Sequence, residues 1–220
     1  GLIIQSKKNR NNYFGRFSDR IIFPIYNFAN QVVGFGGRTL SNSKIKYINS
    51  PENVLFKKSE NLYGLNQNFE NIKKLKEIIL VEGYLDVMAL ISHGVLTSVA
   101  TLGTSFSEIQ INKMWSFSDT PIVCFDGDLA GKNAMESVAL KILKYLKPGK
   151  SFKFMMLPEN MDPDSYIRTN KKEGFNSLKE NAMALSSFIW SIINSQKNTT
   201  PEYIALMDEK IKDIVNIIDN

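Results

Sequence analysis

Residues 78–86 have the sequence IILVEGYLD, in which an apolar run ends at Glu82 and Asp86 follows four residues later. An unbroken apolar run of this kind is typical of a strand that is buried on both faces of a parallel sheet. The residues from Asp86 to Ser92 read as a helix that closes at Gly94, because glycine is favoured just beyond a helix end. This stretch predicts a strand followed by a helix, with acidic side chains where they join.

The same alternation continues toward the end of the chain. Further strands are expected at residues 95–102, 122–125 and 152–157, and helices at residues 107–117 and 130–146. Strands and helices that alternate at this spacing indicate right-handed crossovers and a mostly parallel sheet. The predicted fold class is α/β, with helices flanking this sheet.

Acidic residues follow the predicted strands at three places. These residues are Glu82 with Asp86, Asp126 with Asp128, and Asp162 with Asp164. The carboxyl ends of parallel strands share one edge of a sheet, where open α/β folds bind their ligands. Like charges about 4 Å apart repel by roughly 1–4 kcal/mol, so we expect a divalent cation such as Mg²⁺ to compensate them. Helix capping is the competing interpretation, because the helix dipole also stabilises an acid at a helix start.

The segment before residue 77 is basic. It carries 13 Lys and Arg against 4 Asp and Glu, whereas residues 77–220 carry 14 against 18. This asymmetry favours a polyanionic partner, although a solvated lysine-rich face is the alternative. Residues 21–26 and 31–38 read as a hairpin in which Pro24 indicates an edge strand. Lysines beside aromatic residues at 46–47 and 56–58 suit single-stranded nucleic acid, since charges contact phosphates and rings stack on bases.

These patterns divide the chain into three predicted parts. We expect a basic α+β subdomain at residues 1–76, an α/β domain at residues 77–158 and a helical subdomain at residues 159–220. Residues 7–12 form a polar run, and residues 1–12 are expected to lack regular structure. Apolar stripes at residues 185–193 and 204–218 predict two helices, the second capped by Thr200.

The composition excludes several classes of protein. With 220 residues, 43% of them hydrophobic, the chain can bury its own core, and no apolar run approaches the roughly 20 residues that span a bilayer. The single cysteine, Cys124, excludes an internal disulfide and a cysteine-based zinc site. Neither a Ser-His-acid arrangement nor a Walker-type phosphate loop is present. We expect a cytoplasmic protein without a membrane segment and, because the first residue is Gly1, part of a longer chain.

Taken together, the motifs resemble the TOPRIM module of bacterial replicative primases of the DnaG type. The residues that carry the resemblance are VEGYLD at 81–86, ATLGT at 100–104, CFDGD at 124–128, and LP at 157–158 followed by DPD at 162–164. Upstream, FPI at 23–25, GFGGR at 34–38, KYINSPE at 46–52 and LYGL at 62–65 look like the basic subdomain that precedes this module. The match covers residues 16–168 and departs from the family pattern at Leu129, where the family usually has arginine.

The resemblance implies a DNA-directed RNA polymerase that makes short RNA primers from ribonucleoside triphosphates on single-stranded DNA, at the replication fork in the nucleoid. The implied ligands of Mg²⁺ or Mn²⁺ are the catalytic Glu82, Asp126 and Asp128, together with Asp86, Asp162 and Asp164. The implied contacts to template or nucleotide are Arg20, Arg38, Lys46, Tyr47, Lys57 and Lys58. A Zn²⁺-binding domain and a domain that contacts the replicative helicase are implied outside this chain. A topoisomerase or nuclease with the same module, or a non-catalytic nucleic-acid-binding module, remains as an alternative.

Overall fold

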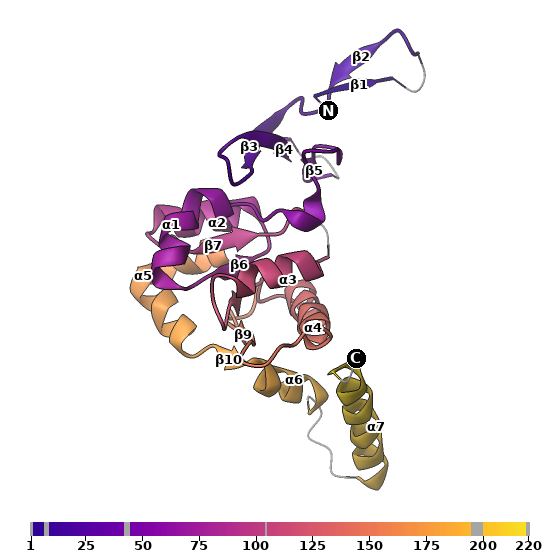
Figure 1. Cartoon of the computed structure of the whole chain (residues 1–220), viewed down its shortest axis with the longest axis vertical. Coiled ribbons are helices and arrows are strands. Elements are labelled where there is room, and N and C mark those ends of the chain that lie inside the picture. Colours follow the sequence, from indigo (N-terminus) through magenta and orange to yellow (C-terminus); the bar gives the residue numbers. More distant parts are fainter. Residues whose placement is uncertain (1, 7–8, 42–44, 104, 195–199, 219–220) are drawn as a thin grey trace.

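The computed structural model of the chain describes residues 2–6, 9–41, 45–103, 105–194 and 200–218. These residues form a two-stranded, a three-stranded and a five-stranded sheet, together with helices. Figure 1 shows them stacked along the long axis, with the N-terminal strands at one end, the five-stranded sheet and its helices in the middle, and the last two helices at the other end. Thr104, the last residue of the ATLGT segment, lies outside the described residues.

The N-terminal residues form a hairpin. Strand β1 (Ile3–Gln5) pairs antiparallel with β2 (Tyr13–Gly15), and Ile4 lies opposite Phe14. The expectation that residues 1–12 lack regular structure is therefore wrong for β1. The polar residues that suggested a loop lie between the two strands, and the short apolar runs on either side of them supply the pairing.

The predicted hairpin at residues 21–38 is confirmed. Strands β3 (Arg20–Tyr26) and β4 (Val32–Thr39) pair antiparallel, and β5 (Tyr47–Asn49) pairs with the other side of β4. Pro24 lies in β3, an edge strand of this sheet, as expected for a residue that cannot donate a ladder hydrogen bond. β5 was not predicted, because three residues are too few to show an alternating pattern.

The five-stranded sheet has the order β10-β9-β8-β6-β7. Strands β6 (Ile79–Val81), β7 (Ser98–Ala100), β8 (Ile122–Val123) and β9 (Lys153–Phe154) are parallel, and β10 (Met183–Ala184) is antiparallel to β9. The predicted mostly parallel sheet is confirmed, although its ladders are shorter than the apolar runs. The remaining residues of those runs, such as Cys124, are buried where the chain leaves the strand.

The helices cover both faces of this sheet. They are α1 (Leu65–Leu75), α2 (Tyr84–Ser92), α3 (Glu108–Trp115), α4 (Leu129–Leu143), α5 (Pro163–Glu180), α6 (Leu185–Ile193), α7 (Pro201–Ile218) and the 3₁₀ turn η1 (Lys58–Glu60). Side chains of α1, α3, α4 and α6 share one buried cluster with Leu80 of β6, whereas those of α2 and α5 share a second cluster with Ile79 and Val81. α2 and α4 therefore pack on opposite faces of the sheet.

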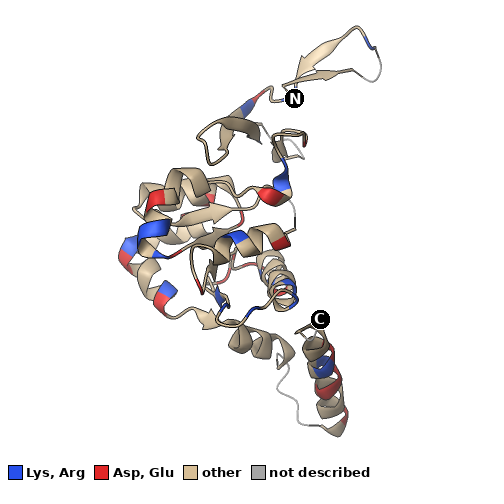
Figure 2. Cartoon of the chain, in the orientation of Figure 1, with Lys and Arg blue, Asp and Glu red and all other residues tan. Residues whose placement is uncertain are grey.

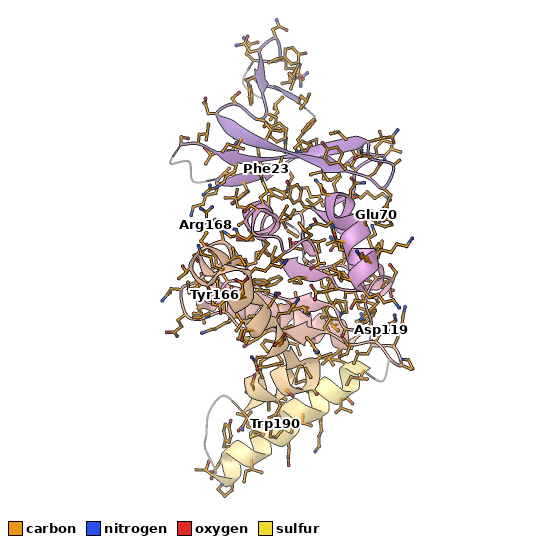
Figure 3. The ribbon with its side chains drawn as sticks, turned by 90° about the vertical axis from the view of Figure 1, so that its left-hand side faces the viewer. Phe23, Glu70, Asp119, Tyr166, Arg168 and Trp190 are labelled. Atoms are coloured by element: carbon orange, nitrogen blue, oxygen red, sulfur yellow. The ribbon has the colours of Figure 1, made fainter. Side chains whose placement is uncertain are left out.

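The C-terminal helices are as predicted. α6 carries Phe188 and Ile189 into the core, and Thr200 caps α7, its hydroxyl accepting a hydrogen bond from the backbone N–H of Tyr203. Basic and acidic residues both occur along α7 (Figure 2), and Trp190 of α6 lies near that end of the molecule (Figure 3). Among the described residues, no helix is long and apolar enough to cross a membrane.

Candidate metal centre and nucleic-acid interface

The predicted acidic residues gather at the carboxyl edge of the parallel sheet. Glu82 directly follows β6, Asp126 and Asp128 follow β8, and Asp162 precedes α5. The segments that carry Asp126 and Asp162 are held together, because the backbone N–H of Gly127 donates a hydrogen bond to the carbonyl of Met161 over 2.8 Å. Residues far apart in the sequence are thereby brought to one edge.

Several of these carboxylates also cap helices. Asp128 Oδ1 accepts a hydrogen bond from the backbone N–H of Gly131 over 2.7 Å at the start of α4, and Asp162 Oδ1 accepts one from Ser165 over 2.6 Å at the start of α5. Asp86 Oδ2 accepts from the backbone N–H of Gly83 over 3.0 Å. One oxygen of each of these carboxylates therefore accepts a hydrogen bond at a helix start, as the capping interpretation predicted.

Gly127 allows the turn between the two aspartates. A Cβ atom at this position would collide with the backbone carbonyl of Pro158, so the loop can adopt this path only without a side chain. The close approach packs the loop after β8 against the chain that leads to α5. Packing thus requires the glycine between Asp126 and Asp128.

The carboxylates raise one another's pKa. Burial, the charge of Asp126 and, less strongly, those of Asp162 and Glu82 raise the pKa of Asp86 to about 7, against the lowering effect of the hydrogen bond from Gly83. Burial and the charges of Glu82, Asp162 and Asp128 raise the pKa of Asp126 to about 6. Buried carboxylates that also repel one another would gain free energy from a bound cation.

Desolvation and the charge of Asp128 also raise the pKa of Glu82, although its side chain is exposed. The backbone N–H of Asp126 opposes this effect, because it donates to Glu82 Oε1 over 3.1 Å. Glu82 and Asp126, which follow neighbouring strands, are thus in direct contact. Asp164 differs from the other acids, since it pairs with Arg168 one helical turn along α5.

The residues present fit a divalent cation. Asp126 Oδ1 is buried and has no hydrogen-bond partner among the described residues, and such an oxygen costs free energy until a donor or cation satisfies it. The neighbouring donors are carboxylate oxygens, which Mg²⁺ and Mn²⁺ prefer. Within the described parts of the chain, however, no three acidic, His or Cys side chains are already arranged as a metal site. The metal-ligand assignment stays a prediction.

The three-stranded sheet lies against this edge. The backbones of Tyr63 and Ala100 exchange two hydrogen bonds of 2.8 and 3.0 Å, and Phe23 of β3 stacks on Tyr84 at the start of α2, with ring centroids 5.3 Å apart. Phe23 lies where the upper sheet meets the central layer (Figure 3). These contacts fix the position of the basic segment relative to the acids.

Asn49 is a positioning residue that was not predicted. Its Nδ2 donates to the carbonyl of Leu102 over 2.7 Å, and its Oδ1 accepts from the Tyr84 hydroxyl, which ties β5 to the loop after β7 and to α2. Burial raises the pKa of Tyr84, so its hydroxyl keeps the proton that it donates. The only signal in the sequence is a polar residue within the short segment KYINSPE.

Tyr47 and Arg38 face the acidic edge from the three-stranded sheet. The Arg38 guanidinium lies over the Tyr47 ring, 6.0 Å from its centroid. Burial raises the pKa of Tyr47, Arg38 lowers it, and the charges of Asp86, Asp126 and Asp162 raise it further. The structure therefore brings Tyr47 within electrostatic range of the predicted metal ligands, with Arg38 beside it.

The other predicted nucleic-acid contacts have different surroundings. The Arg20 guanidinium donates to the carbonyls of Ile45 and Lys46, each over 3.1 Å, and so holds the chain that enters β5. Lys57 pairs with Glu60 at 2.9 Å, while Lys46 is exposed. Lys58 is half-buried in η1. These four assignments stay predictions, and Lys46 has the exposure that a phosphate contact needs.

Two family models match the chain. The model described as the DNA primase catalytic core, N-terminal domain, matches residues 1–69, and the Toprim-like model matches residues 79–167. Among curated proteins, the DNA primase of Legionella pneumophila is 42% identical over 199 residues, which cover 90% of this chain and 34% of that protein. The DNA primase of Escherichia coli strain K12 is 37% identical over 203 residues, covering 92% and 35% respectively. The chain thus spans about a third of the length of these relatives.

Solved structures match over almost the whole chain. The crystal structure of a DNA primase domain from Pseudomonas aeruginosa has a TM-score of 0.93 at 34% identity and covers 99% of this chain and 68% of that one. A DnaG primase catalytic domain bound to single-stranded DNA has a TM-score of 0.88 at 34% identity, covering 99% and 70%. This chain, in which the basic sheet lies over the acidic edge, is therefore similar to both solved structures.

Proposed function

Since this chain belongs to the family of DnaG-type bacterial DNA primases, we propose that it is part of an enzyme that synthesises RNA primers on single-stranded DNA. The reaction is nucleotidyl transfer, in which the 3′-hydroxyl of one ribonucleotide attacks the α-phosphate of a ribonucleoside triphosphate and pyrophosphate leaves. The observation that carries the proposal is the basic sheet held over the carboxylates, with Tyr47 in the field of Asp86 and Asp126.

The carboxylates would hold the divalent ions that the reaction requires. We assign Glu82, Asp126 and Asp128 as the ligands of Mg²⁺ or Mn²⁺, with Asp86 and Asp162 adding negative charge. When bound, divalent cations neutralise the triphosphate and increase the acidity of the attacking hydroxyl. The protein contributes position and charge rather than a covalent nucleophile.

The basic sheet binds the polyanions. Lys46 is exposed beside Tyr47, and Arg38 lies over the same ring, so cations and an aromatic face are presented together near the acidic edge. This combination suits single-stranded DNA, which the similar catalytic domain binds. The similar Aquifex aeolicus primase structure contains a zinc-binding domain beside its RNA polymerase domain. We propose that contacts with a zinc-binding domain and with a replicative helicase are made outside the residues of this chain. The family match at residues 1–69 favours primase over a topoisomerase or nuclease that shares the Toprim-like part.

The test is incorporation of labelled ribonucleotides on single-stranded DNA with Mg²⁺ or Mn²⁺. We expect short RNA from the parent and none from an Asp126→Ala, Asp128→Ala double variant with unchanged DNA binding. The matched control is Asp208→Ala with Asp213→Ala, which removes two exposed acids of α7 and should leave synthesis unchanged. Product from the Asp126→Ala, Asp128→Ala variant contradicts the assignment of the acids. If the parent makes no product, the same variants are compared in a chain of the relatives' full length, and absence of product there contradicts the proposed function.

A further inference from the structure

A cavity of about 490 Å³ lies at the amino edge of the parallel sheet. Its lining includes Lys76 shortly before β6, residues 116–120 before β8 and Lys150 before β9. The predicted metal ligands Glu82 and Asp126 follow β6 and β8. The cavity and the acids therefore lie at opposite edges of the sheet.

The cavity is separate from the candidate metal centre. Asp119 lines the cavity and Asp126 belongs to the acidic cluster, and the seven positions from one to the other correspond to roughly 20 Å of strand. Asp119 and Arg168, which pairs with Asp164, lie on opposite sides of the central layer in Figure 3. A ligand in this cavity would therefore not share a cation that the acids hold.

Three lysines from different parts of the chain line this cavity, which we call the lysine cavity. Lys73 lies in the last turn of α1, Lys76 caps the carboxyl end of that helix, and Lys150 lies in the turn that leads to β9. Asp119 is the one acid among the described residues of the lining. The lysine cavity therefore carries a net positive charge.

The three lysines differ in the partners that they already have. Lys150 Nζ donates to the carbonyl of Trp115 over 2.8 Å and pairs with Asp119 at 2.6 Å, so it joins the end of α3 to the loop before β8. Lys73 and Lys76 form no ion pair with a described residue. The carboxyl end of α1 also favours nearby cations, which is the competing interpretation of these two lysines. Their ammonium groups are available to an anion in the cavity.

The other lining groups suit an anion that is larger than one phosphate. Thr120 is exposed and offers a hydroxyl, and the half-buried Phe117 forms an apolar wall. The volume lies within the range of roughly 300–1,000 Å³ that is usual for small-molecule sites. The lysine cavity can therefore hold several phosphate groups, or a phosphate with an organic group attached.

We propose that the lysine cavity binds the phosphate groups of an anionic ligand directly, without a metal ion. Each ammonium group has three N–H donors, and hydrogen bonds between charged groups are stronger than neutral ones. A phosphate presents several oxygens around one centre, so it can meet Lys73 and Lys76 together, whereas a carboxylate has only two oxygens in one plane. A free oligophosphate and the backbone phosphates of a nucleic-acid strand share this chemistry.

The site differs from both surfaces of the proposed function. The candidate metal centre is acidic and needs a cation before it can hold a phosphate, whereas the lysine cavity supplies its own positive charge. The basic sheet presents Arg38 and Tyr47 toward the carboxyl edge, and the cavity opens at the amino edge. Binding in the lysine cavity therefore requires neither divalent cations nor primer synthesis.

Calorimetric titration of the whole chain in chelator tests the proposal with inorganic tripolyphosphate, a short single-stranded DNA and triglutamate. The double variant Lys73→Gln with Lys76→Gln removes two exposed charges of the cavity, and Lys210→Gln with Lys212→Gln removes two exposed charges of α7 as the matched control. We expect the cavity variant to bind tripolyphosphate at least tenfold more weakly than the parent. The α7 variant, and a variant with arginine at both cavity positions, should bind it within about twofold of the parent.

The DNA and triglutamate titrations distinguish the other outcomes. A loss of DNA affinity in the cavity variant that the α7 variant does not share assigns the cavity to the phosphates of a strand, and unchanged DNA affinity with weaker tripolyphosphate binding assigns it to a free oligophosphate. The proposal is overturned if the cavity variant loses affinity for neither phosphate ligand, or loses no more than the α7 variant does. It is also overturned if the parent binds triglutamate as tightly as tripolyphosphate, because the lysines would then attract any anion.

Discussion

Replacing Asp86 by asparagine should stabilise the metal-free protein at neutral pH. The carboxyl ionises with a pKa of about 7 instead of its ordinary 3.8, so its charge is unfavourable in the folded state. Asparagine keeps an oxygen that can accept the hydrogen bond from the backbone N–H of Gly83, 3.0 Å away in the parent, and so preserves the start of α2. The substitution removes the charge and retains the cap.

The magnitude follows from the pKa. A carboxyl with a pKa of about 7 rather than 3.8 lowers the free energy of unfolding by about 4 kcal/mol once it is fully ionised. Solvent screening of the partly exposed side chain reduces this to about 2 kcal/mol. For a chain of 220 residues we expect the variant's melting temperature to rise by about 4–8 °C.

The sign of the pH dependence makes the test specific. Because the pKa is raised on folding, the parent is most stable with Asp86 protonated and loses stability as pH rises from about 4 through 7. The advantage of Asp86→Asn should therefore be near zero at pH 4, grow up to pH 7 and stay constant above it. Thermal unfolding in chelator across this range measures it, with Asp208→Asn on exposed α7 as the control.

Two results would refute this reasoning. An advantage that does not change with pH would show that the charge of Asp86 is not its cause. An equal advantage for Asp208→Asn would show a general effect of lowering the negative charge. Adding Mg²⁺ at pH 8 extends the test, since the parent should gain more stability from the cation than Asp86→Asn does.

Three further substitutions test the geometry of the site. Gly127→Ala should destabilise the protein by about 2–4 kcal/mol in denaturant unfolding, because its methyl group meets the carbonyl of Pro158; a change below 0.5 kcal/mol would contradict the packing argument. Lys46→Ala should weaken single-stranded DNA binding and flatten its dependence on salt concentration, whereas Lys210→Ala, a matched change on α7, should leave the salt slope unchanged. Asn49→Ala should lower the free energy of unfolding by about 1–3 kcal/mol through loss of its bonds to α2 and the loop after β7, and unaltered unfolding would show that those bonds do not hold the two sheets together.

The parallel sheet could be predicted because its strands lie within unbroken apolar runs of the sequence. Ile79, Leu80 and Val81 point alternately into the two buried clusters, so none of the three can be polar. The shorter strands carry no such signal: β5 and β10 owe their pairing to neighbours that the fold brings beside them. A pattern read along the chain detects burial on two faces but not a pairing that depends on tertiary contacts.

The position of the basic sheet over the acids could not be predicted for a similar reason. It depends on the paired backbones of Tyr63 and Ala100, 37 positions apart in the printed numbering, and on Asn49, which contacts Leu102 and Tyr84. None of these residues has a charge or a spacing that indicates its partner. The grouping of the acids could be predicted because their position after a strand can be seen from neighbouring residues in the sequence. The contact between the two sheets depends on residues that are far apart in the sequence.

Capping and cation binding are compatible uses of the same carboxylates. A residue that follows a parallel strand also precedes the crossover helix, so an acid there meets both the edge of the sheet and the free N–H groups of the helix. The cap occupies Oδ1 of Asp128, and a carboxylate has a second oxygen. Asp126 caps no helix, and its Oδ1 is the buried oxygen that finds no partner in the described part of the chain. The helix caps hold the flanking acids in place, and the unpartnered oxygen marks where a cation would restore the missing interaction.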